Sequence, residues 1–181
     1  NLINWLVTGI LKKALTPAVL DELTSKAAAI GPEDTPLILP YLQGERAPLW
    51  NSKLTASALE LRSSHTDAHL FRAVLESIAF ARRQCFAELG IGPLQLIKIA
   101  GGSSKNGLWN AIRANVLNKP IAVAGEKELG MAGLVDYIMD TAGYASPKPA
   151  IGFAITEPDA DQLSAYDEKY ARFVNYQRLL S

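Results

Sequence analysis

The sequence of 181 residues predicts an α/β domain, and two observations support this fold class. In the second half of the chain, apolar residues follow helical and strand spacing alternately, in the order helix, strand, helix, strand, helix. This order is typical of a sheet covered by helices. The composition is globular, because 49% of the residues are hydrophobic and 20% are charged. A chain of this length suits one domain with a sizeable core.

The first half of the chain predicts two helices, a short strand and a polar loop. Thr16 and Pro17 form a helix start, with a capping side chain before a proline at the first helical position, and Gly31 with Pro32 ends that helix. The expected elements are helices over residues 5–15 and 16–30, a strand over 37–42 that is interrupted at Pro40, and a loop over 43–53.

The second half begins with a long helix, from Ser64 or Thr66 to about Leu89. Its apolar positions are too many for one narrow stripe, so we expect it to be covered on more than one side. The elements expected after it are strands over 94–100 and 121–124, helices over 105–117, 129–142 and 160–180, and a loop over 146–158. About three strands are few for this much helix. We therefore expect a sheet that is open at 94–100 or 37–42, or that another polypeptide completes.

Charge and hydropathy exclude several classes of partner. The formal net charge is zero, so no basic surplus is available to bind nucleic acid or an anionic membrane. No apolar run approaches the ~20 residues of a membrane helix, and residues 1–14 lack the pattern of a signal peptide. Cys85 is the one cysteine, and its helical setting predicts a small buried hydrophobe. A reducing, cytoplasmic location fits these features.

The stretch "IKIAGGSSKNGLWNAI", residues 97–112, carries the strongest candidate site. A predicted strand ends on Gly101 and Gly102, and Asn106 follows in the first turn of a helix. Ligands of open α/β sheets bind beyond the carboxyl ends of the strands, where helix N-termini offer unpaired N–H groups. Glycine lets a phosphate approach the backbone closely. A phosphate site and a plain tight turn both fit this pattern, which is neither G-x-G-x-x-G nor a Walker A loop.

Five stretches, in order, resemble the FGGY family of carbohydrate kinases. The stretch "AGGSSKNGLWNAIRANVLNKPIAV" is similar to the nucleotide-binding strand, turn and helix of that family. The others are "NWL" from Asn4, "LPYLQGERAPLWN", "HTDAHLFRAVLESIAFARR" and "ELGMAGLVDYIMDTAGY". The resemblance covers nearly the whole chain. The stretch "LPYLQGERAPLWN" is most similar to gluconokinase-like and xylulokinase-like members, although the residues that choose the sugar lie elsewhere.

The resemblance implies an actin-like, ribonuclease H-like ATPase fold, in an enzyme that moves the γ-phosphate of MgATP onto a sugar or polyol hydroxyl. Gly101 and Gly102 would lie against the α-phosphate and ribose of ATP or ADP. Asn106 would contact the nucleotide, and Asn4 would lie near its phosphates. Mg²⁺ would be held mainly through the nucleotide and the first domain. The resemblance is compatible with a homodimer of the full protein.

The same resemblance implies that residues 1–181 are most of the C-terminal domain of such a kinase, incomplete on its N-terminal side. The catalytic base and most of the pocket for the sugar or sugar acid belong to a preceding domain in the family. We therefore expect no catalytic residue in this segment and no activity of the segment alone. Three departures limit the comparison: Met131 in the usual Gly-Ala-Ala, residues 52–61 without Ala-Arg-Gly, and the variable Ser103 and Ser104.

Other residues carry weaker signals. Glu45 and Arg46 lie in "LPYLQGERAPLWN", which is very similar to the cleft loop of the family. A local ion pair between them and a role in domain closure or substrate contact are both open. His65, Asp67 and His69 could share a helix face as metal ligands, but we expect helix capping there and no metal site.

A second function class fits the same residues. An actin-like interaction module could keep the fold and lose the chemistry. Intact Gly101, Gly102 and Asn106 argue against this alternative, and a shift of the melting temperature by ATP or ADP would discriminate between the two.

Overall fold

The computed structural model describes residues 2–90, 94–125, 129–144 and 152–181. The helices are α1 (Leu2–Asn4), the π-helix η1 (Trp5–Ile10), α2 (Pro17–Ala28), the 3-10 helix η2 (Pro32–Asp34), α3 (Asp67–Glu88), the 3-10 helix η3 (Gly102–Lys105), α4 (Gly107–Leu117), α5 (Leu129–Thr141) and α6 (Ala160–Leu179). The strands are β1 (Leu37–Leu39), β2 (Ser57–Leu59), β3 (Ile97–Ile99), β4 (Ile121–Ala124) and β5 (Phe153–Thr156). The α/β class is confirmed.

The strands form two small sheets. Strands β1 and β2 pair antiparallel, whereas β3 pairs parallel with β4, and β4 pairs antiparallel with β5. In the part of the chain that the structure describes, β3 and β1 each have one neighbouring strand. The expected open edge is therefore present at both places.

Two strands and one helix end differ from the sequence predictions. The helix expected over 5–15 ends at Ile10, because Lys12 has a positive φ of 55° and breaks the helical path. Strand β2 was not predicted, and β5 lies inside the loop expected over 146–158. Both strands have only three or four residues, too few for a clear alternation, and both depend on partners far along the chain. Residues 146–151 of that loop lie outside the described residues.

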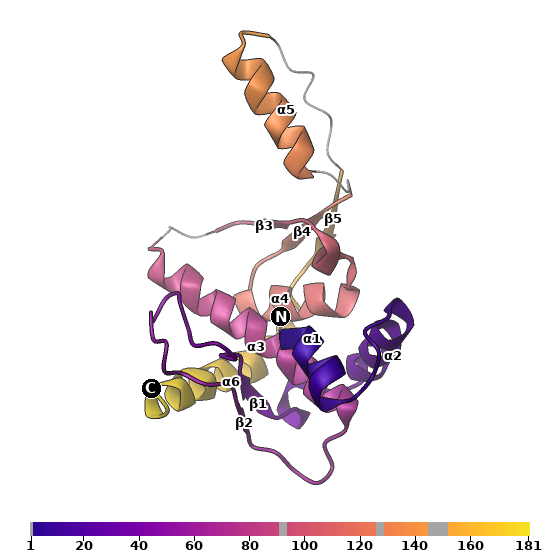
Figure 1. Ribbon diagram of the computed structural model, residues 1–181, viewed down its shortest axis with the longest axis vertical. Coiled ribbons are helices and arrows are strands. Elements are labelled where there is room, and N and C mark those ends of the chain that lie inside the picture. Colours follow the sequence, from indigo (N-terminus) through magenta and orange to yellow (C-terminus); the bar gives the residue numbers. More distant parts are fainter. Residues whose placement is uncertain (1, 91–93, 126–128, 145–151) are drawn as a thin grey trace.

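Helix α3 is the centre of the fold (Figure 1) and packs against α1, α2, α4 and β1. Phe71, Val74, Leu75 and Phe80 are all buried on it, which confirms the expected cover on more than one side. Cys85 near its end is half-buried, and its Sγ donates a hydrogen bond to the carbonyl of Ala47. Within the described residues, no helix combines the length and apolarity that a membrane span requires.

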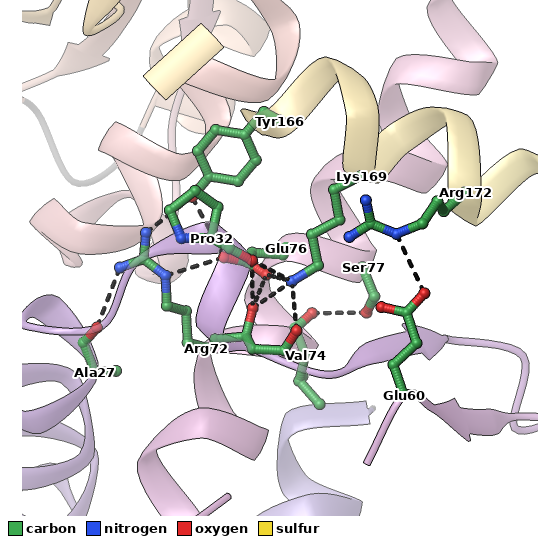
Figure 2. A network of polar contacts seen from close by, with 11 residues as sticks. Ala27, Pro32, Glu60, Arg72, Val74, Glu76, Ser77, Tyr166, Lys169 and Arg172 are labelled. Atoms are coloured by element: carbon green, nitrogen blue, oxygen red, sulfur yellow. Dashed lines mark hydrogen bonds and ion pairs between the residues drawn. The ribbon is translucent and has the colours of Figure 1, made fainter. Parts of the chain in front are cut away.

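A buried polar network lies where α3 meets α6 (Figure 2). The carboxylate of Glu76 is 1% exposed and accepts from Arg72 Nε at 2.9 Å and from Lys169 Nζ at 2.8 Å. The hydroxyl of Thr35 donates to the same carboxylate at 2.7 Å. Burial is the main cause that lowers the pKa of Lys169, and it raises the pKa of Tyr166.

The network extends to the backbone of two neighbouring segments. Arg72 Nη1 donates to the carbonyl of Ala27 at the end of α2, and Lys169 Nζ donates to the carbonyls of Pro32 and Thr35. Since the single carboxylate of Glu76 faces two positive charges, Arg72 and Lys169, these carbonyls compensate the charge that Glu76 does not neutralise. One side chain, Glu76, thereby joins α2, η2, α3 and α6.

We expect Glu76→Gln to lower the free energy of unfolding by about 3–5 kcal/mol, because it leaves two buried cations without an anion. Urea unfolding followed by circular dichroism measures this loss. Glu22→Gln is the matched control, because Glu22 forms an exposed ion pair with Lys26, so its loss should lower the free energy of unfolding far less. Equal losses in the two variants would contradict the assignment of Glu76 as the hub.

Candidate nucleotide-binding site

Three of the four predicted nucleotide residues line one cavity of about 310 Å³. Asn4 comes from α1, Gly102 from the turn after β3, and Asn106 from the start of α4. The remaining walls are Ser103 and the mostly apolar side chains of Ile3, Leu15, Leu20, Phe71, Leu75 and Trp109. Gly101 adjoins this cavity but is not part of its wall. The cavity thus has a polar end at the glycine turn and an apolar remainder, and its wall contains no charged side chain of the described residues.

Glycine occurs at positions 101 and 102 for different structural reasons. Gly101 has φ 94° and ψ 179°, a backbone region essentially reserved for glycine. Its carbonyl accepts from both the N–H and the hydroxyl of Ser104, which closes the turn. Gly102 lies outside the positive-φ region, and a Cβ built on it would meet none of the described atoms within 4 Å. The backbone conformation therefore favours glycine at 101, whereas neither backbone nor packing requires it at 102.

Asn106 is fixed by two hydrogen bonds. Its Oδ1 accepts from the backbone N–H of Trp109 at 2.9 Å, which makes it the N-cap of α4. Its Nδ2 donates to Thr24 Oγ1 on α2, also at 2.9 Å. A side-chain amide keeps a second donor hydrogen and a second lone pair, so Asn106 can still bond a ligand in the cavity.

Asn4 is exposed at the other side of the cavity. Its Oδ1 accepts from the hydroxyl of Thr8 at 3.3 Å, and its amide nitrogen has no partner among the described residues. Asn4 and Asn106 therefore present amide groups to the same space from two different helices.

The family model of the C-terminal domain of the FGGY family of carbohydrate kinases matches residues 1–135. The chain belongs to this family. The gluconokinase of Bacillus licheniformis is 30% identical over 184 residues, which cover 89% of this chain and 36% of that protein.

Solved FGGY kinases have the same fold as this chain. The xylulose kinase of Rhodospirillum rubrum superposes with a TM-score of 0.83 at 26% identity, over 98% of this chain and 37% of that one. The Plasmodium falciparum glycerol kinase, solved with ADP, gives a TM-score of 0.68 at 21% identity over 97% of this chain and 36% of that one. The FGGY chain described here spans about a third of the length of these relatives.

The loop around Glu45 is held by backbone hydrogen bonds to its carboxylate rather than by an ion pair. The carboxylate of Glu45 is buried and accepts from the backbone N–H groups of Leu49 and Trp50 at 2.8 and 3.0 Å. Arg46 is exposed, and no ion pair between Arg46 and Glu45 occurs in the described part of the chain, so the ion-pair alternative is wrong. Neither residue lines the cavity at Gly102.

The two histidines have local roles at the start of α3. His69 Nδ1 accepts from the backbone N–H of Thr66, and His65 Nδ1 accepts from that of Arg62. Asp67 forms an ion pair with Lys13 at 2.7 Å. Among the described residues, no group of three or more His, Cys, Asp or Glu side chains could hold a metal ion.

Two residues at the site were missed by the sequence analysis. Thr24 orients Asn106 from α2, and no pattern links these positions because they are far apart in the chain. Arg113 contacts the glycine turn from α4. A signal for Arg113 does exist, since it lies four residues after Trp109, on the face that the apolar residues of the helix share.

We expect Gly101→Ala to lower the free energy of unfolding by about 1–3 kcal/mol, because alanine is strained at this φ and ψ. Gly102→Ala should instead be neutral or stabilise the chain by up to about 1 kcal/mol, because the backbone at 102 suits alanine and a Cβ there meets no described atom within 4 Å. Urea unfolding of both variants checks the difference. Equal destabilisation would show that the fold needs both glycines.

Proposed function

We propose that this chain is the nucleotide-binding part of an ATP-dependent kinase that phosphorylates a hydroxyl of a sugar or sugar acid. The observation that carries the proposal is Gly102, a glycine that the fold does not require, in the wall of a cavity shared with Asn4 and Asn106. Membership of the FGGY family supports the proposal, and so does the ADP in the related glycerol kinase structure.

The cavity suits a nucleotide in two ways. At its polar end, Gly102 and the backbone N–H groups before α4 would approach the phosphates, with Asn4 and Asn106 bonding the phosphates or ribose. The apolar walls, which include Leu20, Phe71 and Trp109, would pack against the planar base. The contribution of the chain to phosphoryl transfer would be positioning and charge stabilisation.

Magnesium would reach this cavity with the nucleotide. The described cavity wall contains no carboxylate, so the chain itself supplies no acidic ligand there. Bound to the phosphates, Mg²⁺ would neutralise their charge. The residues of the cavity would then orient the phosphates through glycine and amide groups.

The acceptor side of the reaction would be supplied by sequence outside this segment. We assign no catalytic base within residues 1–181, and we infer that the sugar pocket lies mostly in a separate N-terminal domain. Gluconate and xylulose are the substrate types that the relatives favour. A cytoplasmic location and a homodimer of the full protein remain part of the proposal, with Arg46 as a candidate at the cleft.

The first test is a calorimetric titration of the 181-residue chain with ADP. We expect binding, and we expect Gly102→Val to weaken it at least tenfold, because the branched side chain would fill the space of a phosphate. Gly107→Val is the matched control: a Cβ there also meets no described atom within 4 Å, but Gly107 does not line the cavity. A folded Gly102→Val variant with unchanged ADP affinity would overturn the proposed site.

The second test asks whether the 181-residue chain alone can catalyse phosphoryl transfer. We expect the 181-residue chain alone to release no ADP from ATP in the presence of gluconate or xylulose, measured with a coupled assay, because it lacks an assigned base and a sugar pocket. Boiled protein gives the background rate. Turnover at ordinary kinase rates, about 1–100 per second, would show that the catalytic base lies within this segment.

If the chain binds neither ADP nor ATP, the non-catalytic module becomes the better explanation. A shift of its melting temperature by nucleotide measures the same difference without requiring turnover.

A further inference from the structure

Arg113 is a buried arginine that joins α4 to the glycine turn. Its side chain is almost completely buried, with 2% of the residue exposed. Nη1 donates to the carbonyl of Ser103 at 3.3 Å, and Nη2 donates to the hydroxyl of the same serine at 3.2 Å. Nη1 also donates to Asn110 Oδ1 at 2.8 Å, and Asn110 Nδ2 in turn donates to the carbonyl of Ser104 at 2.7 Å. The carbonyls of Ser103 and Ser104 are thus tied to the helix.

The contacts of Arg113 lie directly behind the cavity wall. Ser103 and Trp109 both line the cavity beside Gly102. The guanidinium of Arg113 lies 3.9 Å from the ring centre of Trp109, a cation–π contact, while it holds Ser103. One side chain therefore supports the polar end of the cavity and part of its apolar wall together.

The positive charge of Arg113 has no anionic partner among the described residues. Arg72 is equally buried, but it pairs with Glu76. Burial is the main cause that lowers the pKa of Arg113 to about 10, and a second cation, Arg82 of α3, adds to it. At neutral pH the guanidinium is therefore still charged.

An uncompensated buried charge is costly. Taking an ion out of water costs several kcal/mol unless opposite charge or good hydrogen bonds replace the solvent. Arg113 has neutral acceptors and a ring, and its Nε has no partner in the described part of the chain. An anion in the adjoining cavity would supply the missing compensation.

We propose that Arg113 sets the affinity of this site for the phosphate groups of a nucleotide. It would do so by fixing the Ser103 turn and by placing an uncompensated positive charge behind the cavity wall. This inference rests on the proposed function. Arg113 does not itself line the cavity, so it is a positioning residue that acts through Ser103 and through its charge.

The test compares a ligand that has phosphates with one that lacks them. Calorimetric titrations with ADP and with adenosine are carried out on the 181-residue chain and on Arg113→Met, which keeps the stem but removes the charge. We expect the Kd for ADP to rise about tenfold or more, the effect of one charge at an effective dielectric constant near 20. The Kd for adenosine should change less than about twofold.

A purely structural role for Arg113 would move both ligands together. Equal weakening of ADP and adenosine, or no weakening of ADP, would overturn the inference while leaving the proposed function intact. If the unaltered chain binds no ADP, the proposed function itself fails, and the two failures are thereby distinguished. Arg178→Met, at the exposed end of α6, controls for the loss of one positive charge from the chain.

Arg113→Lys provides a second measurement in case the methionine variant does not fold, as judged by circular dichroism. Lysine keeps the charge but loses the two-pronged hold on Ser103. We expect ADP to weaken about threefold and adenosine to bind as before. If ADP is unaffected in this variant, or if both ligands weaken equally, the inference is overturned.

Discussion

The buried carboxylate of Glu76 is the interaction on which the arrangement of the cavity depends. It holds Arg72 and Lys169, and Arg72 bonds the last turn of α2 through the carbonyl of Ala27. Helix α2 carries Thr24, which bonds the amide of Asn106. Through Thr24 and α2, the position of Asn106, and so of the start of α4, is thus linked to the ion-pair network of α3. A change at Glu76 would reach the cavity without touching it.

The two buried arginines, Arg72 and Arg113, have different roles: Arg72 is paired with a carboxylate, and Arg113, among the described residues, is not. Arg72 bonds a carboxylate, a phenol and a carbonyl, and these partners compensate its charge while joining three helices. Arg113 is surrounded by neutral acceptors and an aromatic ring. Breaking a compensated pair costs stability, because an unpaired charge remains. Retaining an uncompensated one makes sense where a ligand brings the opposite charge.

Much of the fold was predictable because local signals marked its helices. Thr16 with Pro17 set the start of α2 correctly, and the helix predicted over 105–117 begins two residues later than expected, at Gly107. Strands β2 and β5 were not predictable, since each is defined by pairing with a distant partner. The same limit applies to most of the site: the glycine turn was visible in the sequence, whereas Thr24 and the role of Glu45 depend on contacts that no local pattern encodes. Arg113 shares the apolar face of α4, but its contacts with Ser103 do not follow from that position alone.

Three features that the fold does not explain by itself lie at or directly beside one cavity. Gly101 is explained by its backbone angles and Asn106 by its cap, so neither requires a ligand. Gly102 has room for a side chain, Arg113 lacks an anion, and the indole N–H of Trp109 lacks an acceptor among the described residues. A ligand that carries negative charge and acceptor atoms close to the backbone would account for all three. A nucleotide has both properties. The argument for its binding here therefore rests less on the Gly-Gly pair itself than on the difference between the two glycines, since the backbone explains only Gly101.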